Sequence, residues 1–426
     1  MLQVALIRQQ PMFVKERLLV KNFDGAVVID SILLLDEQRK KLQLELEAAQ
    51  ARLNVVSKEI GQLMAKGEKA AAEERKQEVV VIKSKLGPLQ EAAELAETQL
   101  QGLLVTLPNL PSAEVPFGKT PEENVQVRTG GDIPLLIPNR VAHWDLAKKY
   151  NLIDFELGNK ITGAGFPVYI GQGARLQRAL IQYFLDFNTG AGFIEYQPPL
   201  VVNEASAFGT GQLPDKEGQM YYVTEDKFFL IPTSEVPLTN ILRDTIVKDK
   251  DLPFKMTAYT PCFRREAGSY GKDVRGLNRL HQFDKVEIVQ IVEPEKSYGV
   301  LEEMVMHVEK LLQSLELPYR ILLLCGGDMS FTAAITYDFE VYSAAQEKWL
   351  EVSSVSNFES FQTNRMKIRY KDEQGKMTML HSLNGSSLAL PRIVACLLEN
   401  NQLEDSISLP KVLHSYFGAE NIKNKV

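Results

Sequence analysis

Apolar residues recur at alternating spacings of three and four along two long stretches between residues 28 and about 106, where Pro88 is the only proline. The first stripe contains Ile32, Leu35, Leu42, Leu46, Ala49, Leu53, Val56, Ile60 and Leu63, and the second contains Val79, Ile82, Leu86, Leu89, Ala93, Ala96, Leu100 and Leu103. Each stripe is too narrow to bury a helix in a globular core. Gly67 lies between them, so the pattern predicts two helices that reverse there and pair as an antiparallel coiled-coil arm, roughly 50 Å long at about 1.5 Å per residue.

A cluster of prolines follows, at Pro108, Pro111, Pro116 and Pro121. It predicts a linker over 108–139 between a helical arm, 1–107, and a body, 140–426. The body mixes short β-rich runs with amphipathic helices in no strict βαβ rhythm. The predicted strands are 167–170, 193–197, 219–223, 228–231, 255–266, 280–292, 319–324, 339–342, 349–353 and 376–383, and the predicted helices are 174–188, 234–243, 294–315 and 387–400. Many strands with separate helices predict an α+β fold with a mainly antiparallel sheet flanked by helices.

Composition narrows the class of protein. The chain has 48 Lys+Arg against 55 Asp+Glu, so bulk positive charge cannot be what binds a nucleic acid. The three cysteines are widely separated and form no CxxC pair, which argues against a zinc site and a disulfide framework. No apolar run is long enough to span a membrane, and the N-terminus does not resemble a signal peptide. We therefore expect a soluble cytoplasmic protein.

The distal part of the predicted arm carries a small excess of basic residues. Residues 52–85 contain eight Lys+Arg (Arg52, Lys58, Lys66, Lys69, Arg75, Lys76, Lys83, Lys85) and five Asp+Glu. Such a tip could contact phosphates. More often, however, such Lys and Glu side chains simply solvate the flanks of a coiled coil, and the charges alone favour that interpretation.

Residues 262–292 are the richest candidate for chemistry, because the chain contains no Walker-type GxxxxGK[ST], GxSxG or HExxH motif and no complete GxGxxG. The two ends of this segment alternate as strands around a loop with Gly268, Gly271 and Gly276. Arg264 and Glu266 share one face of the first strand, and Phe283, Lys285 and Glu287 share one face of the second. The loop adds Lys272, Arg275 and Arg279. These residues could bind an anion, a base and an ammonium, or form a surface hairpin with ordinary ion pairs.

The run RREAGSYGKDVRGLNRLHQFDKVE within this segment resembles motif 2 of class II aminoacyl-tRNA synthetases, specifically that of the seryl-tRNA synthetase family. Further resemblances follow in order along the chain: the helical arm, HWDLAKKYNLIDFE (143–156), TGAGFPVYIGQGARLQRALIQYFLD (162–186), GFIEYQPPLVV (192–202, motif 1), GTGQLP (209–214), IPTSE (231–235), WLEVSSVSNFESFQ (349–362) and LNGSSLALPRIVA (383–395, motif 3). The order of these segments behind a helical arm makes the resemblance specific.

The resemblance implies an enzyme that activates L-serine with ATP to seryl-adenylate and then charges tRNA-Ser, with tRNA-Sec as a further substrate. It assigns Arg264 to the α-phosphate and the substrate carboxylate, and Arg392 to the γ-phosphate. The implied ATP-binding residues are Arg264, Arg265, Glu266, Leu280, Phe283, Glu351, Val352, Ser353, Ser354 and Arg392. Glu351 and Ser354 would hold Mg²⁺ with ATP, and their spacing of three predicts a bulge or turn in the strand.

The implied serine-binding residues are Thr233, Ser234, Glu235, Arg264, Glu287, Asn384 and Ser386. Taken singly, each such Thr, Ser or Glu is more often a capping or solvated residue. His281 is expected to have a structural role in the hairpin, and no motif supports a role for His307, His381 or His414.

The resemblance also implies partners: a homodimer formed through motif 1, and an arm that holds the long variable arm of tRNA-Ser across the dimer. Two alternatives stay open. One is a relative that activates an amino acid and loads a carrier protein, and the other is a catalytically silent coiled-coil interaction protein. The arm argues against the first, and the presence of Arg264, Glu287, Glu351 and Arg392 argues against the second.

Overall fold

The structure is a computed structural model, and it describes residues 1–215, 217–266, 275–372 and 374–424. It divides into two compact units, one of residues 1–19 and 23–108 and the other of residues 20–22 and 109–426. The α-helices are α1 Val4–Gln9, α2 Pro11–Val20, α3 Ala26–Ala65, α4 Lys69–Leu104, α5 His143–Lys149, α6 Phe155–Ile161, α7 Gln172–Gly190, α8 Glu204–Thr210, α9 Glu235–Asn240, α10 Ser297–Ser314, α11 Phe361–Met366, α12 Leu390–Asn400 and α13 His414–Phe417.

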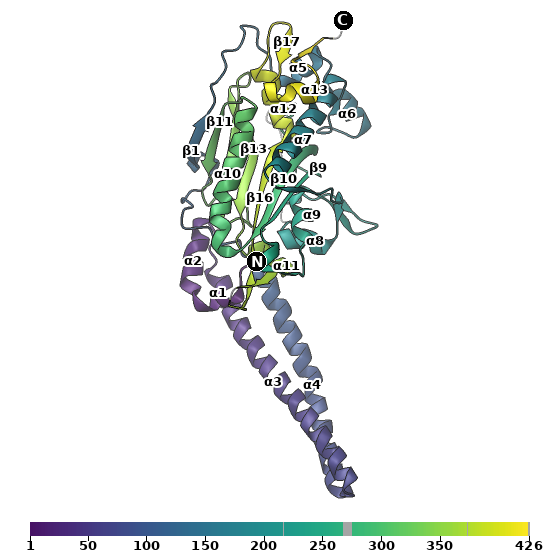
Figure 1. The fold of residues 1–426 in the computed structure, drawn as a ribbon. Helices are drawn as coiled ribbons and strands as arrows, with labels where there is room; N and C mark the ends of the chain where they lie inside the picture. The colour runs from purple at the N-terminus through teal and green to yellow at the C-terminus, as the bar shows by residue number, and fades with distance from the viewer. Residues whose placement is uncertain (216, 267–274, 373, 425–426) are drawn as a thin grey trace. The chain divides into compact units, whose positions relative to one another are not determined.

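The long helices α3 and α4 lie side by side in the first unit and confirm the predicted antiparallel hairpin (Figure 1). They reverse at Gly67, whose φ of 79° is in the left-handed region that glycine tolerates. Residues of the predicted apolar stripes are buried between them, as at Ile32, Val56 and Leu100. None of the helices within the described ranges combines the length and the apolar character needed to cross a membrane.

Ion pairs occupy part of the basic charge at the far end of this hairpin. Arg52 contacts Glu78 at 2.6 Å, Arg75 contacts Glu59 at 3.3 Å, and Lys76 contacts a neighbouring glutamate. The basic side chains that remain exposed there without a described ion pair are Lys58, Lys66, Lys69, Lys83 and Lys85. The end of the hairpin therefore presents five lysines to solvent.

The second unit is built on an eight-stranded sheet, in the order β1-β11-β12-β13-β16-β10-β9-β4. Its neighbouring strands are antiparallel except for β4 and β9, which confirms the predicted α+β class. The strands are β1 Val125–Gly130, β4 Ile194–Glu195, β9 Phe254–Phe263, β10 Gln282–Val292, β11 Tyr319–Leu323, β12 Ile335–Ser343, β13 Lys348–Asn357 and β16 His381–Ala389.

Four small sheets surround this one: β2–β3, β5–β7–β6, β8–β14–β15 and β17–β18. Their strands are β2 Ile153–Asp154, β3 Val168–Tyr169, β5 Val201–Val202, β6 Tyr222–Val223, β7 Phe228–Leu230, β8 Ile246–Val247, β14 Arg369–Lys371, β15 Met377–Met379, β17 Ser406–Ser408 and β18 Asn421–Lys423. Helices α7, α10 and α12 cover one face of the large sheet (Figure 1). Their apolar side chains join Ile288, Phe339 and Val355 in the main core. The other face of the central strands is covered in part by a second core, to which β10 contributes Val289 and Ile291.

Three local expectations differ from the structure. The segment predicted as a linker, 108–139, contains β1, which pairs with β11 at the edge of the large sheet. The helix predicted from residue 387 begins at Leu390, because β16 continues to Ala389. Strand β16 carries the run Asn384–Ser387, whose small polar residues lack the alternation by which a strand is recognised. The strand predicted over 376–383 is divided between β15 and β16.

Candidate active site

A cavity of about 580 Å³ opens on the face of the central strands that α7, α10 and α12 do not cover, beside the second core. It is lined from β10, β13 and β16, from the residues around both ends of the β9–β10 loop, and from the start of α9 and α12. Most of the predicted site residues line it: Thr233, Glu235, Arg264, Glu266, Leu280, Phe283, Glu287, Glu351, Val352, Ser353, Ser354, Asn384, Ser386 and Arg392. Segments that are far apart in the sequence therefore meet in one cavity, as the family resemblance implied.

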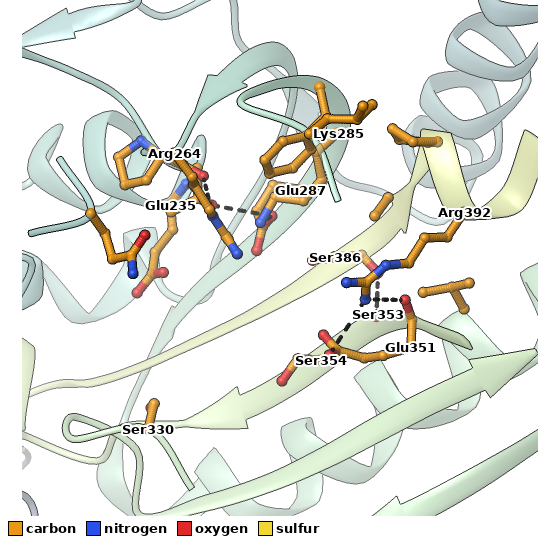
Figure 2. Close-up of a pocket in the computed structure, with 18 of the residues that line it drawn as sticks. Glu235, Arg264, Lys285, Glu287, Ser330, Glu351, Ser353, Ser354, Ser386 and Arg392 are labelled. Carbon is orange, nitrogen blue, oxygen red and sulfur yellow. Dashed lines mark hydrogen bonds and ion pairs between the residues drawn. The ribbon is translucent and has the colours of Figure 1, made fainter. Parts of the chain in front are cut away.

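One end of the cavity holds two buried carboxylates. Glu235 begins α9, and Glu287 lies in β10. The Lys285 ammonium contacts Glu287 Oε2 at 2.6 Å, and the Thr233 hydroxyl donates to the same oxygen at 3.3 Å. Arg264 lies beside them, as Figure 2 shows. This end of the cavity can therefore hold an ammonium and a carboxylate next to each other.

The Glu235 carboxyl group is held by Gln362 of α11, whose amide Nε2 donates to Glu235 Oε1 at 2.6 Å. The same amide nitrogen also donates to the carbonyl of Thr210 at 3.2 Å. Burial, together with the nearby negative charge of Glu287, raises the pKa of Glu235 from 4.5 to about 7. Glu235 is thus poised to change charge when a cation enters or leaves its surroundings.

Arg264 follows directly after β9 and is fixed by hydrogen bonds to the chain just before β10 and just before α9. Its backbone N–H donates to the carbonyl of His281 at 2.9 Å, and its Nε donates to the carbonyl of Pro232 at 3.4 Å. The guanidinium carbon lies 5.2 Å from the centroid of the Phe283 ring. A cationic fork beside an aromatic face suits a phosphate joined to a base.

The opposite end of the cavity contains Arg392, Glu351 and Ser354 (Figure 2). Arg392 Nη1 donates to the Glu351 carbonyl at 2.6 Å and lies 3.5 Å from the Glu351 carboxylate. Its Nε donates to the carbonyl of Asn278 at 3.1 Å. A guanidinium held in this way by main-chain oxygens keeps a defined direction toward the cavity.

The predicted irregularity in strand β13 is confirmed. Pairing between β12 and β13 shifts at Val352, so that Ser354 lies opposite Asp338 and Glu351 lies opposite Glu340. Because Asp338 and Glu340 are two residues apart, the shift brings Glu351 and Ser354 to the same face. The bulge therefore allows a carboxylate and a hydroxyl three residues apart to point into one site.

The loop between β9 and β10 is described only at its two ends. Glu266 Oε2 accepts from Arg279 Nη1 at 3.0 Å, which joins the two ends. Gly268, Gly271 and Lys272, which were expected in this loop, lie outside the described residues. His281 has the structural role that was predicted: its Nδ1 bonds the Tyr221 hydroxyl at 2.9 Å.

Two of the predicted residues do not line the cavity. The Ser234 side chain is fully buried and bonds the Thr260 hydroxyl at 2.7 Å. The Arg265 side chain is exposed, while its backbone N–H donates to the carbonyl of Gln219 at 2.9 Å. Both residues adjoin a residue that does line the cavity.

Sequence reasoning assigned no site role to several residues that line or support the cavity. Those that line it are Gln212, Glu217, Gln219, Leu277, Asn278, Ser330, Thr332, Ser356 and Phe358. Lys285 was recognised as sharing a face with Glu287, but without a role of its own. Gln362 supports Glu235 from behind the lining residues. Some of them, such as Gln212, Asn278 and Ser356, lie within the segments that resemble the family, but nothing local distinguishes them from neighbours that do not reach the cavity.

Comparison with known proteins agrees with this geometry. Residues 1–111 match the seryl-tRNA synthetase N-terminal domain, and residues 221–401 match the class II core domain of tRNA synthetases for G, H, P, S and T. The chain is 50% identical over 424 residues to the serine–tRNA ligase of Salinibacter ruber and 46% identical over 425 residues to that of Akkermansia muciniphila, covering 99% of each pair of chains.

Solved structures give the same picture. The seryl-tRNA synthetase of Pyrococcus horikoshii, solved with ATP, is similar over 100% of both chains with a TM-score of 0.92 and 32% identity. The cytoplasmic serine–tRNA ligase of Naegleria fowleri, solved with AMP, has a TM-score of 0.87 at 25% identity and covers 100% of this chain and 99% of that one. The antiparallel sheet and its cavity define a class II aminoacyl-tRNA synthetase. Within that class, the chain belongs to the seryl-tRNA synthetase family, which confirms the resemblance found in the sequence.

The raised pKa of Glu235 predicts a pH-dependent stability. Between about pH 4.5 and pH 7 the folded protein retains a proton that the unfolded chain has released, so the free energy of unfolding falls as pH rises, by up to about 1.4 kcal/mol per pH unit. The free energy of unfolding of Glu235→Gln should not fall in this way, because glutamine does not titrate. Denaturation at pH 5, 6, 7 and 8 should therefore show the free energy of unfolding of the variant rising relative to that of the wild type up to pH 7. A difference that stays constant with pH would contradict the assignment.

Proposed function

We propose that the cavity activates L-serine with ATP and that the chain then transfers the seryl group to the 3′ end of tRNA-Ser. The observation that carries this proposal is the arrangement of charge within one cavity. Two carboxylates and Arg264 lie at one end, and Arg392 lies with Glu351 at the other. This order fits an amino acid placed next to the α-phosphate of a nucleoside triphosphate.

In the proposed serine pocket, Glu287 and Glu235 receive the ammonium and the hydroxyl group. Thr233, Asn384 and Ser386 complete the polar lining. A hydroxyl bound by buried polar partners can be distinguished from its absence by about 10⁴-fold or more, because alanine leaves those partners unpaired. The pocket would thus recognise serine through its hydroxyl rather than through apolar contact.

In the activation step, a serine carboxylate oxygen attacks the α-phosphorus of ATP. A bond forms between them, the bond from the α-phosphorus to the bridging oxygen breaks, and pyrophosphate leaves with the electron pair. Arg264 neutralises charge on the carboxylate and the α-phosphate, while Phe283 stacks on adenine and Glu266 supports the nucleoside. Arg392 orients the γ-phosphate. Catalysis of this kind depends on alignment and electrostatic stabilisation more than on proton transfer.

The residues near Arg392 fit a magnesium ion that arrives with ATP. Glu351 and Ser354 offer hard oxygen ligands on one face, and the nearby Asp338 has an Oδ1 atom without a hydrogen-bond partner among the described residues. No group of three His, Cys, Asp or Glu residues in the described ranges forms a metal cage. Mg²⁺ commonly binds through one or two protein oxygens plus substrate phosphates, and when bound it would neutralise phosphate charge.

Glu351→Gln should weaken the magnesium dependence of serine activation. We expect the Mg²⁺ concentration for half-maximal ATP–pyrophosphate exchange to rise about tenfold, because a neutral amide is a weaker ligand than a carboxylate. Glu347→Gln is the matched control, since Glu347 lies in the turn between β12 and β13 and pairs with Arg140. If the two variants required the same Mg²⁺ concentration for half-maximal exchange, Glu351 would not be a magnesium ligand.

The partners follow from the family and from the hairpin of α3 and α4. We propose that this hairpin, with its five exposed lysines, contacts the sugar–phosphate backbone of the variable arm of tRNA-Ser, in a homodimer that works in the cytoplasm. Recognition by shape and backbone requires only modest positive charge. An extension to tRNA-Sec is proposed on family grounds alone. A seryl-tRNA synthetase of M. kandleri, solved in complex with A. aeolicus tRNA-Sec, is 18% identical to this chain.

Two assays distinguish this function from its alternatives. Serine-dependent ATP–pyrophosphate exchange followed by charging of tRNA-Ser is the expected result. Exchange without tRNA charging would favour a ligase that loads a carrier protein. Failure of both reactions would favour a silent interaction protein on the same fold.

A further inference from the structure

His143, the first residue of α5, is fully buried and makes hydrogen bonds through both ring nitrogens. Its Nδ1 lies 2.7 Å from Glu399 Oε1, and its Nε2 accepts from the backbone N–H of Leu277 at 2.8 Å. A backbone N–H can only donate, so Nε2 must be unprotonated and the ring proton must lie on Nδ1, facing Glu399. The ring is therefore fixed as one tautomer between α12 and the end of the β9–β10 loop.

The Glu399 carboxylate is itself held in place by several hydrogen-bond donors. It is fully buried in α12 and accepts from the Ser343 hydroxyl, from Gln346 Nε2 at 2.9 Å and from the His143 backbone N–H at 2.9 Å. Burial alone would raise the pKa of Glu399, but the hydrogen bonds from His143 and Ser343 outweigh it and lower that pKa. An ionised carboxylate with these donors holds the imidazole in one orientation.

The loop segment that rests on His143 also holds Arg392. Leu277 and Asn278 both line the cavity. The Asn278 carbonyl accepts from Arg392 Nε at 3.1 Å, and the Asn278 amide donates to Gln346 Oε1 at 3.0 Å. A continuous hydrogen-bonded path thus joins Glu399, through His143 and the loop backbone, to the guanidinium at the phosphate end of the cavity.

The fit between the loop and α5 is close. Gly276 has a φ of 67°, and a Cβ atom at this position would clash with His143 Nε2. The guanidinium carbon of Arg275 lies 4.5 Å from the centroid of the Trp144 ring. The backbone of 275–278 is therefore seated directly on the first two residues of α5, where a side chain at 276 would interfere.

We propose that His143 is a positioning residue for ATP, and that its neutral ring fixes the backbone of Leu277 and Asn278 and thereby the direction of Arg392. This inference rests on the proposed role of the cavity in binding ATP. It does not involve the serine end, whose carboxylates are held by Lys285, Thr233 and Gln362. Loss of the His143 contact should therefore weaken ATP binding and leave serine binding largely unchanged.

Two substitutions separate the two ring nitrogens. The amide oxygen of His143→Gln can take the place of Nε2 and accept from Leu277, whereas the amide nitrogen of His143→Asn can take the place of Nδ1 and donate only to Glu399. We expect Asn to weaken Mg·ATP binding, measured by calorimetry, about tenfold, and Gln to change it less than threefold. The serine KM in exchange should stay within threefold for both. His414→Asn, which removes a hydrogen bond to the Leu409 carbonyl outside the cavity lining, is the control.

If His143 had a purely structural role, the two variants would bind Mg·ATP with the same affinity, or the serine KM would rise as much as the dissociation constant of Mg·ATP. Either result overturns the proposal. If neither variant folds, Gly276→Ala tests the same contact from the loop side, with Gly375→Ala as its control. Gly375 has a similar φ of 77°, but a Cβ atom there would meet no other atom within 4 Å. Equal ATP affinity for these two alanine variants would also overturn it. A wild type that binds ATP but shows no serine-dependent exchange would instead refute the proposed function.

Discussion

Arg264→Ala should abolish serine-dependent ATP–pyrophosphate exchange, with a loss of at least about a thousandfold. Its guanidinium lies next to the Phe283 ring and lines the same cavity as both acidic residues of the proposed serine pocket. A preorganised donor aimed at charge that develops in the transition state contributes about 10²–10³-fold. Arg264 would also lose its ground-state contacts with carboxylate and phosphate, so the combined effect is expected to be larger.

The adjacent residue supplies a matched control. Arg265 has the same side chain, but it is exposed and does not line the cavity. Arg265→Ala should retain exchange within about threefold and melt at the same temperature as the Arg264 variant. If both variants lost activity equally, the loss would reflect the hairpin as a whole and not a specific guanidinium. If Arg264→Ala kept full exchange, the assignment of the phosphate site would be wrong.

Deleting residues 40–100 and joining Arg39 to Gln101 through a short Gly-Ser linker should separate the two reactions of the enzyme. The cavity lies wholly within the second unit, so exchange should persist. Charging of tRNA-Ser should fall by at least about a thousandfold, because the proposed contact surface for the variable arm is removed. Exchange rate and charging rate, measured on the same preparation, give the result directly.

A milder variant distinguishes a specific surface from general damage. Replacement of the five exposed lysines at the end of the hairpin, Lys58, Lys66, Lys69, Lys83 and Lys85, by Gln leaves α3 and α4 paired. It should weaken charging and reduce its dependence on salt, since fewer phosphate contacts release fewer counterions. If the variant that lacks residues 40–100 still charged tRNA-Ser at the wild-type rate, the hairpin would have no role in tRNA recognition.

The sequence predicted the hairpin well because its signal is local and repeated. Spacings of three and four continue over two stretches, and a glycine marks the reversal. The class of the body also followed from local pattern. Strand β16 was only partly recognised, since small polar residues such as Asn384 and Ser386 face a cavity instead of a core. β1 was missed because it is a short edge strand whose Val125 and Val127 are exposed.

Site residues were predicted where the family resemblance assigned them a role. Arg264, Glu287, Glu351 and Arg392 came from the family resemblance, and the bulge in β13 came from the chemistry expected of Glu351 and Ser354. The supporting residues could not be found in this way. His143 and Glu399 are 256 residues apart, and although His143 begins the segment 143–156, nothing in the sequence connects it with Glu399. Such pairs depend on tertiary structure and leave no periodic signal.

The central claim is that Arg264, Phe283 and the two buried glutamates surround one seryl-adenylate. A crystal structure with the non-hydrolysable analogue seryl-sulfamoyl adenosine tests it most directly. We predict adenine on the Phe283 ring, the sulfamoyl oxygens at Arg264, and the ammonium and hydroxyl at Glu287 and Glu235. An analogue bound elsewhere, or bound in this cavity with its seryl group away from both glutamates, would contradict the account.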